Sequence, residues 1–231
     1  RAAVQVTRWL AEQGFPVVRP LPVAQPVAVE GHLVTFWHDE RHTGPAPDPA
    51  LLGLLLRRLH ALPQPPCALP PYDPFGPVRR AIGLSRVLGD ADRRWLLDRC
   101  AALAEAYRER LAFRLPPGLV HGDAHPGNLR RVAGRLLLDG WDRVGVGPRE
   151  VDLVPALQEA GADERRRRAF GEAYGYDVTR WEGYPVLRAV RALQTLLPAL
   201  RTGRGRGAGP PAGRAARRRR AGLATAVSGI P

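Results

Sequence analysis

Hydrophobic residues recur at helical spacing along most of the chain. In residues 2–13, Val4, Trp9 and Leu10 fall near one face, which predicts an amphipathic helix. Residues 50–62 are apolar nearly all round, which predicts a central helix buried on all sides. The same spacing predicts further helices at 76–87, 90–113, 149–160, 163–175 and 181–200.

Two stretches have the pattern of β-hairpins. Val-rich segments at 26–30 and 32–37 flank a Glu-Gly turn, and the apolar segments 129–133 and 135–139 flank Gly134. The pattern therefore predicts a little β-structure early in the chain, then mostly helix around one small hairpin.

Length and composition are those of a globular protein. The chain has 231 residues, of which 45% are hydrophobic and 25% charged, enough to bury a sizeable core. No run of about 18 uncharged apolar residues occurs, so we expect no membrane span. With only Cys67 and Cys100, a disulfide framework is not expected, and the reducing cytoplasm is the predicted location. The chain contains no Met, so we expect a fragment or a processed product.

The net charge of +13 is concentrated at one end of the chain. No Lys occurs, so all 35 basic residues are Arg, and eight of them lie in residues 201–231, which contain no acid. Such a segment is typical either of an arm that binds nucleic acid or of a disordered end that builds no core. The second interpretation is favoured, because no aromatic residue is interleaved for base stacking. We therefore expect no nucleic-acid partner and no membrane partner, and nothing in the sequence indicates an oligomeric state.

The candidate chemistry lies in "LVHGDAHPGNL", residues 119–129. Asp123 follows an apolar strand end, Asn128 comes five residues later, and Asp139 ends the next apolar run. Phosphoryl transfer from ATP needs one carboxylate to position a hydroxyl, and an amide with a second carboxylate to hold Mg²⁺. The order His121, Asp123, Asn128 matches the H-R-D-x-x-x-x-N loop of protein kinases, which is also followed by an Asp after a hairpin.

Other interpretations of this loop remain open at this point. His121, Asp123 and His125 alternate, so on a regular strand they would share a face and could bind Zn²⁺ in a metal-dependent hydrolase. Pro126 and the neighbouring glycines argue against a regular strand. Asp123 and Asn128 could also be simple turn residues, or the chain could be a degenerate, non-catalytic binding module.

Several motifs together resemble the aminoglycoside phosphotransferase family, whose members are protein-kinase-like enzymes. They are "LVHGDAHPGNL", "LLLDGWDRVGVGPREVDLVP", "TFW", "LLRRLHALP" and "FGEAYGYD". The resemblance covers about residues 1–202. It implies an α+β, protein-kinase-like fold that is mainly the helical C-terminal lobe (38–202), with a small remnant of the N-terminal lobe sheet (1–37) and an Arg-rich tail (203–231).

The resemblance also implies roles for individual residues of the loop and hairpin. Asp123 would be the catalytic base, and His121 would brace the loop by hydrogen bonding. Asn128 and Asp139 would bind Mg²⁺, with Asp142 as the fallback ligand.

The remaining implied roles concern the nucleotide and the interior. Phe36, Trp37 and His38 would form the hinge whose backbone faces adenine, and Asp152 would be a buried structural acid. The cofactors would be ATP, or GTP, with Mg²⁺, and the acceptor would be a small molecule with a hydroxyl group, such as an aminoglycoside.

The sequence departs from the family pattern in three respects, one of which is Ala3, where the first helix should offer an acid to pair with a Lys. Gly140 stands between Asp139 and Trp141, and counting back from Gly147 and Pro148 places the metal-ligand position on Gly140. Either a one-residue bulge absorbs this shift or the metal site is damaged. The chain also has no Lys to clamp the phosphates. We therefore expect it to be weakly active or inactive as a phosphotransferase.

Overall fold

The computed structural model describes residues 1–40, 48–159 and 163–202. Packing divides the chain into two compact units. The first is made of residues 1–72 and 114–178, and the second of residues 73–113 with those from 179 onward. The predicted Arg-rich tail lies outside the described residues. The division into two lobes at residue 37 rests on the resemblance and stays a prediction.

In its described residues, the first unit combines four α-helices with short paired strands. Its helices are α1 (Ala2–Glu12), α2 (Pro49–Ala61), α5 (Glu150–Glu159) and α6 (Glu164–Tyr174). Two 3-10 turns, η1 (Pro126–Asn128) and η2 (Trp141–Arg143), lie in the same unit. Its strands are β1 (Val27–Val29), β2 (His32–Val34), β3 (Gly118–Val120), β4 (Leu129–Val132), β5 (Arg135–Leu138) and β6 (Gly145–Gly147).

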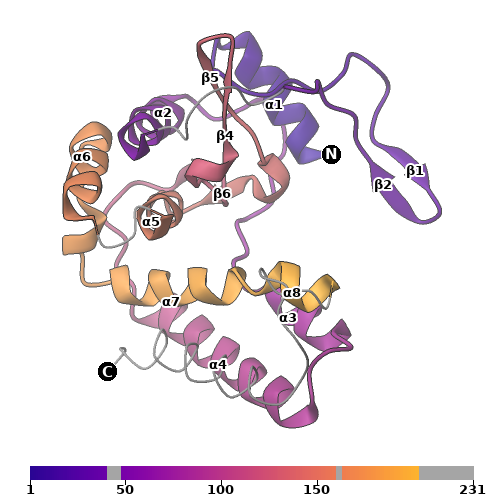
Figure 1. Cartoon of the computed structure of the whole chain (residues 1–231), viewed down its shortest axis with the longest axis vertical. Helices are drawn as coiled ribbons and strands as arrows, with labels where there is room; N and C mark the ends of the chain where they lie inside the picture. The colour runs from indigo at the N-terminus through magenta and orange to yellow at the C-terminus, as the bar shows by residue number, and fades with distance from the viewer. Residues whose placement is uncertain (41–47, 160–162, 203–231) are drawn as a thin grey trace. The chain divides into compact units, whose positions relative to one another are not determined.

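These strands pair two by two, each pair antiparallel: β1 with β2, β4 with β5, and β3 with β6. The first two pairs confirm the predicted hairpins. In the β4–β5 turn, Ala133 and Gly134 have φ of 46° and 77°, as a tight hairpin turn requires. The β1–β2 hairpin is largely exposed and extends away from α1 (Figure 1). Strand β6 was not predicted, because its three residues include two glycines and show no alternation.

Helix α2 carries much of the core of the first unit. Asp48 accepts a hydrogen bond from the backbone N–H of Ala50 at 2.9 Å and so caps the start of the helix. Leu56 and Leu59 on this helix are fully buried. The prediction that α2 is buried on all sides is wrong, since Leu54 is 52% exposed. The helix packs one face inward and leaves the other to solvent.

The second unit is helical in its described part. It contains α3 (Gly76–Leu84), α4 (Asp90–Glu109), α7 (Tyr184–Gln194) and α8 (Leu197–Thr202). Helix α7 lies along α4, and α8 lies beside α3 (Figure 1). The predicted helix at 181–200 is therefore two helices. Their shared core includes Val78, Ile82, Cys100, Leu103, Val190 and Leu193. No helix in the described ranges of either unit is long and apolar enough to cross a membrane.

We predict that Gly53→Ala destabilises the first unit. A Cβ atom at Gly53 of α2 would lie 2.8 Å from the carbonyl oxygen of Phe170 in α6, so the two helices would have to separate. We expect a loss of about 1–3 kcal/mol in unfolding free energy, measured by urea denaturation. The matched control is Gly83→Ala in α3, where a Cβ atom meets nothing within 4 Å. It should leave stability unchanged or raise it by up to about 1 kcal/mol.

Candidate functional site

The candidate loop begins where β3 ends, and a buried carboxylate holds it there. Asp152, in the first turn of α5, has no solvent exposure. Its Oδ2 accepts the backbone N–H of His121, and its Oδ1 accepts that of Gly122, both at 2.7 Å. This confirms Asp152 as a buried structural acid. The two bonds fix the backbone immediately before Asp123.

A histidine and a tyrosine complete the surroundings of Asp152. His60 of α2 places Nε2 3.1 Å from Asp152 Oδ2 and Nδ1 2.8 Å from the hydroxyl of Tyr174 in α6. Burial raises the pKa of Tyr174, so its hydroxyl stays protonated and can donate to His60 Nδ1. His60 is a packed core residue. Its bond to Asp152 was missed, because the three residues are far apart in sequence.

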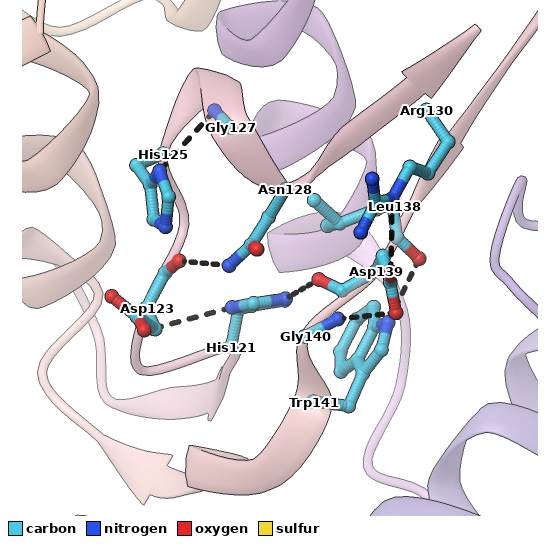
Figure 2. Close-up of polar contacts among 10 residues, drawn as sticks. All are labelled: His121, Asp123, His125, Gly127, Asn128, Arg130, Leu138, Asp139, Gly140 and Trp141. Carbon is cyan, nitrogen blue, oxygen red and sulfur yellow. Dashed lines mark hydrogen bonds and ion pairs between the residues drawn. The ribbon is translucent and has the colours of Figure 1, made fainter. Parts of the chain in front are cut away.

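The ring of His121 joins the loop to the segment after β5. His121 Nε2 lies 2.8 Å from the carbonyl oxygen of Asp139, and Nδ1 accepts the backbone N–H of Asp123 at 3.2 Å (Figure 2). The ring also packs against Trp141, with 4.5 Å between ring centroids. Burial lowers the pKa of His121, so the ring is neutral and carries its proton on Nε2. This arrangement is a brace between two backbone segments.

Backbone contacts also bring the predicted metal ligands to the same place. Asn128 donates from Nδ2 to the carbonyl oxygen of Asp123, and its own carbonyl oxygen accepts the N–H of Asp139, both at 2.9 Å. His125 Nδ1 accepts the N–H of Gly127 at 3.2 Å, which closes the loop locally (Figure 2). Asp123, Asn128 and Asp139 are therefore neighbours through their backbones.

The side chains of the two acids do not converge. The carboxylate groups of Asp123 and Asp139 lie on opposite sides of Asn128 (Figure 2). Asp139 Oδ2 lies 3.0 Å from Nε of Arg130, and Oδ1 accepts the N–H of Gly140 at 2.7 Å. Arg130 was not singled out from the sequence, since no motif connects it to Asp139.

Residue 140, and not the side chain of residue 139, faces the amide of Asn128. Gly140 has φ of 81°, and a Cβ atom there would lie 2.5 Å from Asn128 Nδ2 and 2.9 Å from Oδ1. The count back from Gly147 and Pro148 put the predicted metal-ligand position on this same residue, and that role stays a prediction. The fallback acid, Asp142, lies exposed on η2.

Residues 1–190 match a family described as the phosphotransferase enzyme family. The chain belongs to this family. No curated protein matches the sequence, whereas many solved structures match the fold.

Three solved structures illustrate this similarity of fold. A choline/ethanolamine kinase family protein from Mesorhizobium loti is 19% identical, with a TM-score of 0.63 over 100% of this chain and 79% of that chain. Amicoumacin kinase hAmiN, in complex with AMP-PNP, Ca²⁺ and Ami, is 16% identical and has a TM-score of 0.67. The match covers 98% of this chain and 75% of that chain. An aminoglycoside phosphotransferase from Streptomyces rimosus is 21% identical and has a TM-score of 0.57. The match covers 87% of this chain and 82% of that chain. These neighbours confirm the predicted kinase-like fold.

The residues of this phosphotransferase do not fit a cation between Asn128 and Asp139. Mg²⁺ needs several oxygen ligands directed at one point. Both carboxylate oxygens of Asp139 are instead engaged, one by Arg130 and one by Gly140. A zinc site fits no better, since both ring nitrogens of His121 are hydrogen-bonded. Within the described part of the chain, no set of three His, Cys, Asp or Glu side chains could hold a metal ion.

The predicted hinge of the phosphotransferase pairs with the segment before β1. The carbonyl oxygen of Phe36 accepts the N–H of Leu21 at 2.9 Å, and the N–H of His38 donates to the carbonyl oxygen of Arg19 at 3.0 Å. Alternate residues of a paired strand direct their backbone groups to opposite sides. The backbone N–H and C=O of Trp37, between Phe36 and His38, therefore point away from this pairing.

We predict that the free energy of unfolding decreases as the pH is lowered below about 6.5, and that His121 is the cause. Above that pH the ring is neutral in both states, but below it the unfolded chain takes up a proton that the folded chain resists. Unfolding free energy should drop by up to about 1.4 kcal/mol per pH unit, until the pH reaches the lowered pKa of the folded state. Urea denaturation between pH 5 and 7 should show a smaller slope for His121→Asn. The exposed His32→Asn should keep the slope of the unsubstituted chain.

We also predict that Gly140→Ala destabilises the protein by about 2–4 kcal/mol, because a positive φ and a clash with Asn128 act together. Gly134→Ala is the control, since Gly134 has φ of 77° but open space around it. Gly134→Ala should lower the free energy of unfolding, measured by urea denaturation, by only about 1–2 kcal/mol. Equal losses for the two variants would mean that the contact with Asn128 contributes nothing.

Proposed function

We propose that the chain transfers the terminal phosphoryl group of ATP or GTP to a hydroxyl group of a small molecule. The observation that carries this proposal is the loop geometry: Asp152 and His121 fix the backbone that leads into a partly exposed Asp123. Membership of the phosphotransferase family supports the reaction class. The kinase neighbours support a small-molecule acceptor.

The nucleotide base would bind at Phe36, Trp37 and His38. An adenine ring offers one hydrogen-bond donor and one acceptor on neighbouring atoms. The backbone N–H and C=O of Trp37 are directed away from the pairing with residues 19–21, so they are the groups that match this pattern. Phe36 is 41% exposed and offers an apolar surface beside them.

Asp123 would act on the acceptor hydroxyl. As that oxygen forms its bond to the γ-phosphorus, its proton passes to the Asp123 carboxylate, the bond from the γ-phosphorus to the bridging oxygen breaks, and the nucleoside diphosphate leaves. His121 and Asp152 would not touch the substrate. They hold the backbone of Asp123 and so limit the geometry its carboxylate can sample.

The role of Mg²⁺ remains part of the proposal. When bound, the ion would neutralise charge on the phosphates, and Asn128 is predicted to contact it. Asp139 and Asp142 are the predicted further ligands, but Asp139 is paired with Arg130, and Asp142 lies exposed on η2. We therefore expect a slow enzyme, since phosphoryl transfer depends almost entirely on positioning and electrostatics.

The ion pair between Asp139 and Arg130 favours a second candidate function, a nucleotide-binding module without turnover. Such a module needs the hinge and the folded loop but no convergent metal ligands. The pairing of Asp139 with Arg130 fits this alternative directly. A cytoplasmic location is proposed for either function and is consistent with two free cysteine thiols, Cys67 and Cys100.

We predict that Asp123→Asn lowers phosphoryl transfer at least ~100-fold, because the amide cannot accept the hydroxyl proton. The assay follows ADP release from ATP and Mg²⁺, with choline and a set of aminoglycosides as acceptors. ATP-dependent thermal stabilisation should be retained in the variant. Asp98→Asn is the control, since Asp98 is an exposed acid on α4 in the second unit.

Three outcomes of this experiment are distinct. Turnover in the unsubstituted chain that disappears only in Asp123→Asn supports the phosphotransferase. Nucleotide binding without turnover in either protein supports the binding module. Neither stabilisation nor turnover in any protein rejects both.

A further inference from the structure

The β4–β5 hairpin places a guanidinium group beside the predicted metal ligand. In the hairpin register, Arg130 lies opposite Leu137, and Leu129 lies opposite Leu138. Asp139 follows two residues after Leu137, so Arg130 and Asp139 are diagonal neighbours on one face of the hairpin. The side chain of Arg130 reaches across this diagonal to Asp139 (Figure 2).

The resulting contacts engage both carboxylate oxygens of Asp139. The guanidinium of Arg130 lies 3.0 Å from Oδ2, while the N–H of Gly140 holds Oδ1 at 2.7 Å. The pair has no net charge, so it offers little attraction to a cation. A divalent ion that binds Oδ2 would have to compete with Arg130.

We propose that Arg130 takes the place of a metal ion at Asp139, so that an internal ion pair holds the cation site of the proposed phosphotransferase closed. The inference rests on that proposed function only in identifying the ion as the one that accompanies the nucleotide. Removing the guanidinium frees Asp139 Oδ2, on the residue whose backbone N–H already bonds to the carbonyl oxygen of Asn128. A free carboxylate oxygen is the kind of hard ligand that Mg²⁺ and Mn²⁺ prefer.

The test measures Mn²⁺ binding to the full chain by electron paramagnetic resonance, without nucleotide. The unsubstituted chain should bind Mn²⁺ weakly, and Arg130→Gln should bind it about tenfold more tightly or better, because a charge-assisted hydrogen bond no longer competes. Arg135→Gln is the matched control, since Arg135 is exposed and its substitution removes the same charge from the same hairpin. It should bind Mn²⁺ like the unsubstituted chain.

Two further variants identify the groups involved. Arg130→Lys keeps the positive charge and should keep Mn²⁺ binding weak. The double variant Arg130→Gln with Asp139→Asn should lose the gain, because no carboxylate is left to bind the ion. If circular dichroism shows that Arg130→Gln is poorly folded, Arg130→Met retains the aliphatic stem and repeats the measurement.

Several results would overturn the proposal. They are equal Mn²⁺ affinity in Arg130→Gln and Arg135→Gln, tight binding by the unsubstituted chain, or a gain that survives in the double variant. Nucleotide binding is measured separately, as thermal stabilisation by ATP in EDTA and in Mg²⁺. Its absence in every variant would reject the proposed function and leave the Mn²⁺ result standing.

Discussion

The site depends on one buried carboxylate, that of Asp152. An isolated buried charge is strongly unfavourable, so it persists only where hydrogen-bond donors replace water. Three donors do so here: the backbone N–H groups of His121 and Gly122, and the ring of His60. Because these donors come from the end of β3 and from α2, one side chain of α5 joins three segments of the first unit.

Much of the fold and of the loop could be predicted, because the signals are local. The cap formed by Asp48 and the turn at Gly134 depend on residues a few positions apart. The spacing from His121 to Asn128, with Asp139 after the hairpin, likewise matched the kinase loop, and the backbones of Asp123, Asn128 and Asp139 are neighbours. The roles of these residues in catalysis and metal binding remain predictions.

The missed features arise from contacts between residues distant in sequence. Nothing near His60 shows that it will meet Asp152, since the pairing is created by packing α2 against α5. The exposure of Leu54 has the same origin, because an apolar helix is covered only where partners exist. Arg130 reaches Asp139 only through the register of the hairpin, which a count of residues does not reveal.

The Arg130–Asp139 pair is also partly open to solvent, with 40% and 31% of the two side chains exposed. Mobile ions weaken a pair in such a position, since the Debye length is only about 8 Å at physiological ionic strength. Asp152, by contrast, is sealed from solvent and is screened far less. Ionic strength can thus loosen the Arg130–Asp139 pair while the loop beside it keeps its shape, so two neighbouring parts of the candidate site differ in their sensitivity to salt.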